Sequence, residues 1–507
     1  MSRSDLCLLV AGAFLLTLAF PPFHLFVPSF VCLLPAVLLI ERGNNDRLPL
    51  HRQVQFGFLF GLFTNGLLLY WMVSALWQYT SLSLLGYAST VLLLSAYCAG
   101  VFALCGWIVR AAGVSILVAF PVLWTALEWV LAHQFDLRFP WLGLGTSLTG
   151  YPTVVQIADV VGARGVTFLL ALANTALALA WIGRRRRKRA IGLCCAVGVG
   201  IVLASGYGLV RENTIETRPL GEVALIQPNV GTVEKWDRTL QDGIIASLIV
   251  SSEDAHVEVN PDLIVWPEAA VPGDLERRTD WRASITSFSR RVSTPMVIGG
   301  LHSEVLADST VIRFNAAFVF DSAGRGDGYP IYHKQYLVPI TERVPFLPRS
   351  ALNLPWFGSF ASGDAGTVYR LGFGSFGVLI CYESAFEDLA RIYRMDGADF
   401  LVNITNDAWF GRTTTPYQHA SHLVMRAIEN RVGIARAANT GISEFVDPFG
   451  REYERTELAV ETYAFSTVKT SDVLTLYSRL GDWVGGTVIL MSLILIGYAW
   501  WRKRQPL

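Results

Sequence analysis

The chain has 507 residues, of which 52% are hydrophobic and only 16% are charged, and its mean hydropathy is +0.41. This composition is too apolar for a soluble enzyme, and the length predicts more than one domain. The formal net charge is +0 at pH 7. No basic face can dominate such a chain, which argues against a nucleic-acid partner.

Apolar stretches near the roughly 20 residues that a membrane-spanning helix needs recur along the chain. About seven precede residue 212 and one follows the polar half: 6–20, 25–40, 56–76, 84–109, 114–133, 166–182, 191–210 and 484–501. So many nearly uncharged stretches are not typical of buried helices in a soluble protein. The sequence therefore predicts a membrane domain over 1–212 and a last span with a basic tail over 473–507.

Arginine and lysine predict the orientation. If about eight spans alternate, the arginines near 3, 42–52 and 110 fall on one side, together with the basic runs 184–189 and 502–504. By the positive-inside rule that side is cytoplasmic. We therefore expect a multi-pass protein of a bacterial inner membrane, with its long polar segment facing the periplasm.

From residue 219 to 472 charges return and apolar runs shorten to strand length. Several runs are continuous and β-branched, which is typical of strands buried on both faces, and helical patterns lie between them. This alternation predicts an α/β domain of roughly 250 residues. The predicted strands are 223–226, 263–265, 296–298, 316–320, 376–380 and 400–403, and predicted helices include 240–252, 281–292 and 420–432.

Cys381 directly follows the predicted strand 376–380 and precedes Tyr382-Glu383-Ser384. The remaining cysteines lie in apolar stretches, so Cys381 has no local partner for a disulfide or a zinc site. At a strand-to-helix corner a sulfur can point out of the turn, and the next backbone N–H can meet a developing oxyanion. Cys381 is therefore either a nucleophile or a buried structural thiol.

Two further polar residues follow predicted strands, Glu268 in the run WPE and Lys334 in the run YHKQYLVP. In α/β sheets, residues just beyond the strand ends gather in one crevice. A partly desolvated carboxylate can take a thiol proton, and a lysine can stabilise a thiolate or an oxyanion. Each residue alone is a common surface residue, but the combination with Cys381 in this order is specific.

These runs resemble the Glu-Lys-Cys triad of the nitrilase (carbon–nitrogen hydrolase) superfamily, and with the flanking membrane segments the chain resembles its apolipoprotein N-acyltransferase family. The resemblance covers essentially the whole chain. It includes QPN at 227–229, KW at 235–236, NITNDAWF at 403–410, RAIENR at 426–431 and ANTG at 438–441. It implies a polytopic α-helical membrane domain of about eight spans plus an α/β nitrilase-like α-β-β-α sandwich domain.

The resemblance implies a ping-pong acyl transfer. Glu268 would take the thiol proton, and Cys381 would accept an acyl chain as a thioester from a phospholipid, typically from sn-1 of phosphatidylethanolamine. The α-amino group of an S-diacylglyceryl cysteine, exposed on a prolipoprotein after signal-peptide removal, would then take the chain. Lys334 and the Tyr382 N–H would stabilise the oxyanion. No metal or soluble cofactor is implied, because the lipid is the acyl donor.

Other positions carry over from the family one by one. Glu342 matches a second essential glutamate that would hold the lysine or assist proton transfer, with a surface salt bridge as the alternative. Tyr382 and Glu383 match residues behind the nucleophile. The family pattern has Phe-Gly before the second glutamate, whereas this chain has Ile340-Thr341. Because a conformationally free glycine is missing, the placement of Glu342 is less certain than that of the triad.

Aromatic residues suggest how substrate enters. Trp236 matches a tryptophan on a loop over the active site, with core packing as the alternative. Trp356 and Phe357, in the run PWFG, are possible lid residues that dip into lipid and admit substrate, with ordinary loop packing as the alternative. The sequence does not indicate an oligomer, and we expect a monomer.

Three other interpretations stay open. A membrane-bound nitrilase-type amidase or hydrolase shares the acyl-enzyme and differs only in that water resolves it. A transporter would use ionisable residues inside its spans, and Glu128 is the clearest such residue in this chain. A purely structural membrane protein is the third interpretation, but it would not need the triad. The histidines are expected to be structural, because no carboxylate or thiol lies at metal-ligand spacing from them; they are His302, His333, His419 and His422.

Overall fold

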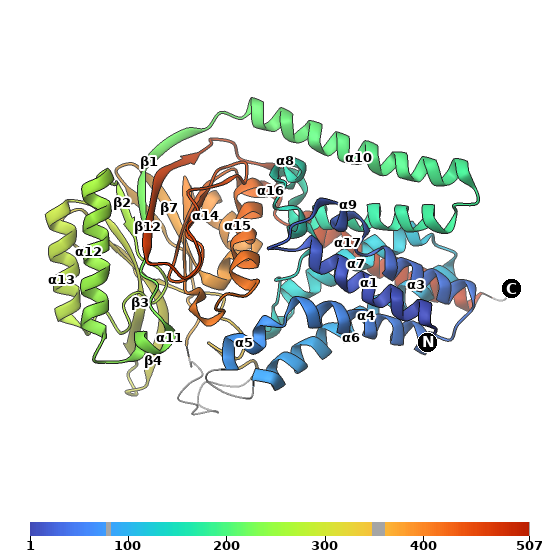
Figure 1. Cartoon of the computed structure of the whole chain (residues 1–507), viewed down its shortest axis with the longest axis horizontal. Coiled ribbons are helices and arrows are strands. Elements are labelled where there is room, and N and C mark those ends of the chain that lie inside the picture. The colour runs from blue at the N-terminus through green and yellow to red at the C-terminus, as the bar shows by residue number, and fades with distance from the viewer. Residues whose placement is uncertain (78–82, 347–359, 506–507) are drawn as a thin grey trace. The chain divides into compact units, whose positions relative to one another are not determined.

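The computed structural model describes residues 1–77, 83–346 and 360–505. The chain divides into two compact units (Figure 1). The helical unit comprises Met1–Gln134, Arg138–Thr214 and Leu480–Leu507, and the α/β unit comprises Phe135–Leu137 and Ile215–Arg479.

The helical unit contains long apolar helices joined by short turns. Its helices are α1 (Arg3–Ala19), α2 (Phe26–Val31), α3 (Leu34–Asn45), α4 (Leu50–Leu68), α5 (Trp71–Trp77), α6 (Ser83–Ala112), α7 (Ile116–His133), α8 (Pro152–Val155), α9 (Ala158–Ile182), α10 (Arg187–Thr214) and α17 (Trp483–Arg504), with the 3₁₀ turns η1 (Phe135–Leu137) and η2 (Leu144–Leu148) nearby in sequence. Within the described residues, six helical stretches are long and apolar enough to cross a membrane: Phe26–Asn45, α6, α7, α9, α10 and α17. The predicted polytopic membrane domain is confirmed. The count of about eight was approximate, since α1 and α4 are not among the six.

The exposed apolar surface of these helices fits a lipid environment. Only 6% of the most apolar part of α10 is buried, and 28% of that of α17. Val199, Val202 and Leu203 on α10 are each more than half exposed. Such helices satisfy all their backbone polar groups internally, so they can present apolar side chains to lipid at no hydrogen-bonding cost.

Glu128 lies in a buried ionic cluster of the helical unit. Its Oε1 accepts from the Leu144 N–H at 2.8 Å and its Oε2 from the Thr167 hydroxyl at 2.8 Å. Arg164 Nη1 lies 4.0 Å from Glu128, and Arg164 Nε donates to Asp482 at 3.0 Å. Since these contacts join α7, α9 and the start of α17, they favour a structural role for Glu128 over a role in transport.

The α/β unit contains two six-stranded sheets. The first has the order β12-β1-β2-β3-β4-β5 and the second β11-β10-β9-β8-β7-β6 (Figure 1). The strands are β1 (Arg218–Gln227), β2 (Leu263–Val265), β3 (Met296–Val305), β4 (Val311–Phe320), β5 (Tyr332–His333), β6 (Val368–Leu371), β7 (Gly374–Ile380), β8 (Phe400–Thr405), β9 (Gly433–Ala438), β10 (Glu444–Val446), β11 (Glu452–Tyr453) and β12 (Thr462–Thr470). In both sheets three neighbouring strands run parallel, β1-β2-β3 and β7-β8-β9. Their carboxyl ends are the positions at which α/β folds place reactive groups.

Alternation along the strands builds four layers. Val223 and Leu225 of β1 enter a core that also contains β7, β8 and β9, whereas Ala224 and Ile226 face a second core. That second core is closed by α12 (Gln241–Val259) and α13 (Thr279–Val292), and the outer face of the other sheet is covered by α14 (Glu387–Met395) and α15 (Thr415–Asn430) (Figure 1). Because side chains alternate with period two, one strand can serve two cores. The predicted α-β-β-α sandwich is confirmed.

Short segments complete the α/β unit. These are the helices α11 (Thr232–Trp236) and α16 (Leu476–Leu480) and the 3₁₀ turns η4 (Cys381–Ala385) and η5 (Asp407–Trp409). All six predicted strands lie within observed strands, and the three predicted helices coincide with α12, α13 and α15 to within a few residues. β9 was missed because its sequence, GIARAA, is rich in glycine and alanine, which have low β-propensity. Only its complete burial between neighbours makes it a strand.

Candidate active site

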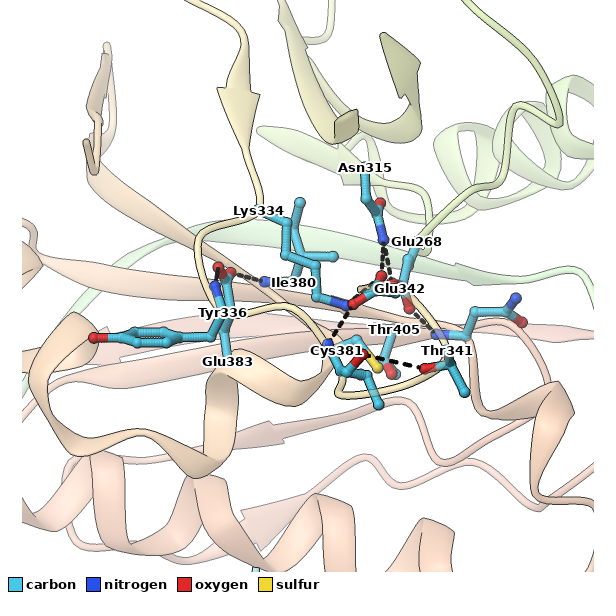
Figure 2. A network of polar contacts seen from close by, with 12 residues as sticks. Glu268, Asn315, Lys334, Tyr336, Thr341, Glu342, Ile380, Cys381, Glu383 and Thr405 are labelled. Atoms are coloured by element: carbon cyan, nitrogen blue, oxygen red, sulfur yellow. Dashed lines mark hydrogen bonds and ion pairs between the residues drawn. The ribbon is translucent and has the colours of Figure 1, made fainter. Parts of the chain in front are cut away.

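Cys381 lies at the corner that the sequence predicts. β7 ends at Ile380, and Cys381 begins η4 with a φ of 53°. A left-handed conformation in a residue other than glycine costs about 1–3 kcal/mol and persists only where surrounding contacts hold it. Figure 2 shows the Cys381 side chain gathered with those of Glu268, Lys334 and Glu342. The corner therefore presents the sulfur to a group of charged side chains.

Glu268 is fixed by donors to both of its oxygens. It follows β2 and is 6% exposed. Asn315 Nδ2 donates to Oε1 at 2.7 Å (Figure 2). The Asn406 backbone N–H donates to Oε2 at 2.8 Å. Lys334 Nζ lies 3.3 Å from the same Oε1. These contacts hold the carboxylate in one orientation beside the thiol.

Lys334 bridges two carboxylates. Its side chain is 1% exposed, and Nζ also lies 2.9 Å from Glu342 Oε1. Glu342 is held in turn by the Val338 N–H, which donates to Oε2 at 2.8 Å, and by Asn315 Nδ2, which donates to Oε1 at 3.0 Å. Glu342 is therefore part of the site and does not form the surface salt bridge considered as its alternative.

The departure at Ile340-Thr341 does not prevent Glu342 from reaching Lys334. The left-handed residue of the turn is Ile340, with a φ of 73°, rather than Thr341. The Ile340 N–H donates to the Arg343 carbonyl at 2.7 Å, and the Glu342 N–H donates to the Val338 carbonyl at 3.0 Å. A β-branched residue in this region is strained. Two backbone hydrogen bonds thus close the turn, and the strained backbone conformation falls on Ile340.

The charges around the thiol keep it protonated at rest. Burial raises the pKa of Cys381 well above its usual value, and the Glu268 carboxylate raises it further, although the Lys334 ammonium lowers it. Burial by itself lowers the pKa of Lys334, but the carboxylates of Glu268 and Glu342 outweigh burial and hold that pKa well above its usual value. Lys334 therefore stays cationic, and the thiol needs a base in order to attack.

Glu383 fixes the nucleophile corner to the lysine segment. It is fully buried, and its Oε2 accepts from the Ile380 N–H at 2.6 Å while its Oε1 accepts from the Gln335 N–H at 2.6 Å. The Tyr332 hydroxyl donates to it at 2.9 Å. Burial raises the pKa of Glu383 to about 7, and the N–H of Ile380 and the charge of Lys334 lower it. The Glu383 side chain thus ties the end of β7, just before Cys381, to the segment just after Lys334.

A second buried network supports the corner from behind. His419 Nε2 lies 2.9 Å from the Cys381 carbonyl oxygen, and its Nδ1 lies 2.9 Å from Asp407 Oδ1. Arg436 Nη2 donates to Asp407 Oδ2 at 2.9 Å. His419 therefore contacts the main chain of Cys381, which agrees with the structural role expected for it.

Comparison with known proteins identifies the family. Residues 12–176 match the family model "Apolipoprotein N-acyltransferase N-terminal domain", and residues 222–486 match "Carbon-nitrogen hydrolase". The apolipoprotein N-acyltransferase of Geobacter metallireducens is 31% identical over 99% of this chain and 96% of that protein. The apolipoprotein N-acyltransferase of Brucella melitensis is 32% identical over 89% of this chain and 86% of that protein. That of Methylococcus capsulatus is 30% identical over 98% of this chain and 96% of that protein. The chain belongs to the apolipoprotein N-acyltransferase family.

The family assignment makes this chain an N-acyltransferase with a carbon–nitrogen hydrolase domain and membrane-spanning helices. Among solved structures, an amidase from Nesterenkonia sp. is similar, with 17% identity, a TM-score of 0.37, and coverage of 53% of this chain and 95% of that one.

The remaining predicted positions differ in what the structure describes. Trp236 ends α11 and is 44% exposed, so it is not a core-packing residue. Tyr382 is 5% exposed, and its ring packs edge-on against Phe386 at 5.1 Å. Trp356 and Phe357, the possible lid residues, lie outside the described residues.

Sequence reasoning gave no role to the asparagines of this site, although the runs NITNDAWF and ANTG contain Asn406 and Asn439. Asn315 donates to Glu268 and Glu342, and the Asn406 N–H donates to Glu268. Asn439 donates to the Asn406 side chain at 2.9 Å. One signal was available for Asn315, because a polar residue interrupts the apolar run FNAAFVF of β4, and buried polar groups require partners.

One group in the described part of the chain has ligand atoms close enough to hold a metal ion. It consists of His302, Glu304 and His333, whose ligand atoms lie within 4.8 Å of one another, so the expectation that no carboxylate lies at ligand spacing from these histidines is wrong for Glu304. His302 Nδ1 already lies 2.9 Å from His333 Nε2, and the His333 ring stacks on Phe314 at 3.9 Å. Burial, together with the neighbouring charge of His302, lowers the pKa of His333 to about 4. That no metal is needed for the reaction stays a prediction.

Proposed function

We propose that this N-acyltransferase moves an acyl chain from a membrane phospholipid, through a thioester on Cys381, to the N-terminal amine of a lipoprotein. Glu268 accepts the thiol proton as the sulfur attacks the sn-1 ester carbonyl of phosphatidylethanolamine. The tetrahedral intermediate collapses, the C–O bond breaks, and the lysophospholipid leaves with a proton from Glu268. The α-amino group of an S-diacylglyceryl cysteine then attacks the thioester and gives a proton to Glu268. The C–S bond breaks as the amide forms, and that proton returns to the Cys381 sulfur.

The observation that carries the proposal is a protonated thiol beside a fixed carboxylate and a permanent cation. Glu268 has the geometry of a general base, since its oxygens are held by Asn315 and the Asn406 N–H. Lys334 can turn its ammonium toward an oxyanion, and the backbone N–H of Tyr382, directly after the nucleophile, is the second donor we assign to it. Tyr382 and Glu383 hold the corner, and Glu342 holds Lys334.

A lipid donor is supported by the helices that accompany this site. A tether would need one span, whereas the described residues include six stretches long enough to cross a membrane. The donor and the diacylglyceryl acceptor both reside in a bilayer. We place the α/β unit on the periplasmic face of the inner membrane by the distribution of Lys and Arg, with the chain acting as a monomer and using no cofactor.

Intact-protein mass spectrometry after incubation with phosphatidylethanolamine tests this proposal. The wild-type chain should gain one acyl mass that a diacylglyceryl-cysteine peptide discharges, and Cys381→Ala should gain none. Cys105→Ala, which removes a buried thiol of the helical unit, is the matched control and should gain the same mass as wild type. If Cys381→Ala is acylated like wild type, Cys381 is not the nucleophile.

The same experiment separates the acyltransferase from a membrane-bound amidase or hydrolase. Both form the acyl-enzyme, but only an acyltransferase transfers the chain to the amine. An adduct that water discharges as fast in the absence of the peptide as in its presence would favour the hydrolase.

A further inference from the structure

The buried charges of the site do not balance. Glu268 and Glu342 are two carboxylates, and the ammonium of Lys334 lies between them. Asn315 and two backbone N–H groups also donate to these carboxylates but are neutral. One negative charge is therefore left uncompensated in a site that is nearly closed to water, where unpaired charges are costly.

A buried cation without an assigned role lies on α11. Lys235 is 1% exposed, although its neighbours Val233 and Trp236 are 73% and 44% exposed. Within the described ranges its Nζ has no hydrogen-bond partner. Burial lowers the pKa of Lys235 to about 8, and the Glu268 carboxylate acts in the opposite direction. A lysine is rarely buried in this way unless a charge partner compensates it.

The start of α11 is fixed to the segment that holds Glu268. Asn439 Oδ1 accepts from the Val230 N–H at 3.0 Å, and Asn439 Nδ2 donates to the Val230 carbonyl at 2.8 Å. The same Nδ2 donates to Asn406 Oδ1 at 2.9 Å. The Asn406 N–H in turn donates to Glu268. The position of Lys235 is thus coupled to that of Glu268 through two asparagines.

Other charges near the thiol are already paired. Asp407, which follows β8, is held by Arg436 and His419. The titratable groups on the elements around the thiol are Glu268, Lys334, Glu342, Cys381, Glu383, Asp407, His419 and Lys235. Of these, Lys235 is the cation that forms no ion pair with any residue that the structure describes.

We propose that Lys235 is a positioning residue whose buried positive charge balances the second carboxylate and keeps Glu268 ready to accept the Cys381 proton. The proposal rests on the proposed function, because it assigns Lys235 to the same base and nucleophile. Lys235 acts through Glu268 and does not itself touch the acyl group.

Removing the charge should shift the pH dependence of the site. In Lys235→Met the same carboxylates take up protons more readily, and the thiolate is less stable. We expect acyl-enzyme formation on the acidic side of the pH–rate profile to slow about ten-fold. The acidic limb of that profile should move to higher pH by about one unit. Lys235→Arg keeps the positive charge, so the acidic limb of its pH–rate profile should coincide with that of wild type. Lys469→Met, which removes an exposed lysine of the same unit, is the matched control and should change nothing.

The experiment follows two rates between about pH 5 and pH 7, below the pKa of about 8 of Lys235, where this side chain still carries its proton. One is acyl-enzyme formation from phosphatidylethanolamine. The other is alkylation of Cys381 in the folded protein by iodoacetamide, which needs no acyl donor and is measured on the peptide that contains Cys381. Superimposable pH profiles for wild type and Lys235→Met overturn the inference and leave the proposed function intact. If the pH profile of alkylation differs between Lys235→Met and wild type but no variant is acylated, the proposed acyl donor is wrong and the inference about Lys235 stands.

A folding defect in Lys235→Met does not end the test. If the missing charge causes the defect, Lys235→Met with Glu342→Gln, which removes one carboxylate as well, should regain the wild-type unfolding temperature. A double variant that folds no better than Lys235→Met shows that packing and not charge balance requires the lysine, and overturns the inference.

Discussion

Two buried clusters in this molecule have the same charge composition and different uses. The helical cluster is Glu128, Arg164 and Asp482, and the catalytic cluster is Glu268, Lys334 and Glu342. Their side-chain exposures are nearly equal, at 8%, 4% and 13% in the first and 8%, 1% and 13% in the second. Burial and charge count therefore do not distinguish a structural ionic cluster from a catalytic one.

The difference lies in the cation and in its neighbours. Arg164 presents a rigid fork that holds Glu128 on α7 and Asp482 before α17, so its geometry serves to join helices. Lys334 carries an ammonium that can rotate its donors, and it lies next to a thiol at a strained corner. An ionic cluster becomes reactive when its cation can turn toward a developing charge.

The largest expected effect on acylation comes from removing the charge of the less exposed carboxylate in each cluster. Glu268→Gln keeps the shape of the side chain but cannot take the thiol proton, so acyl-enzyme formation should fall about 10³-fold. Glu128→Gln should leave turnover per folded molecule unchanged and cost about 1–3 kcal/mol of stability. Burst-phase acylation and thermal unfolding in detergent measure the two outcomes. A turnover loss in Glu128→Gln as large as in Glu268→Gln would contradict the division into two roles.

The cations give the next largest effect. Lys334→Met should lower the rate of acyl-enzyme formation about 10²–10³-fold, because the oxyanion loses a preorganised donor. Lys334→Arg should restore little of it, since a fork cannot occupy the position of an ammonium. Arg164→Met leaves two buried carboxylates without their cation and should lower stability by about 3–5 kcal/mol while sparing the chemistry of the molecules that fold. Wild-type stability in Arg164→Met would show that the helical cluster does not join its helices.

The fold and the positions of Glu268 and Cys381 at strand ends could be predicted because their signals are local. Apolar length predicts spans, and continuous β-branched runs predict β2, β7 and β8. Glu268 and Cys381 each follow a predicted strand, so the rule about strand ends is sufficient to bring these two together. Lys334 instead follows the two-residue strand β5, which is not among the predicted strands.

The supporting groups could not be predicted because their partners are distant in sequence. Asn439 and Asn406 are 33 residues apart, and Asn406 and Glu268 are 138 residues apart. The edge strands β5, β6 and β11 are two to four residues long and follow no hydrophobic period. The charge of Lys235 acquires meaning only when its burial and its electrostatic interaction with Glu268 are known.

The second carboxylates should give intermediate effects. Glu342→Gln weakens a charge-assisted bond to Lys334 but can keep the Val338 bond, so we expect a loss of roughly 10–100-fold in the rate of acylation. Asp482→Asn removes the charge that pairs with Arg164 and disturbs the helix cap formed with the Gly485 N–H at 2.9 Å. It should lower the unfolding temperature by several degrees and leave acylation unchanged. An equal acylation loss in both variants would mean that Glu342 acts through stability alone.

The smallest expected effect is at the exposed tryptophan that ends α11. Trp236 is 44% exposed at the end of α11, and Trp483, next to Asp482, is 39% exposed. If Trp236 contacts the lipid chains of the substrates, Trp236→Ala should raise KM roughly five-fold, the equivalent of about 1 kcal/mol of lost apolar contact, with kcat little changed. Trp236→Phe should keep most of the affinity, and Trp483→Ala should change neither constant. A fall in kcat at constant KM would instead assign Trp236 to positioning Lys235 and, through it, the base, because a group that only binds substrate cannot slow the chemical step alone.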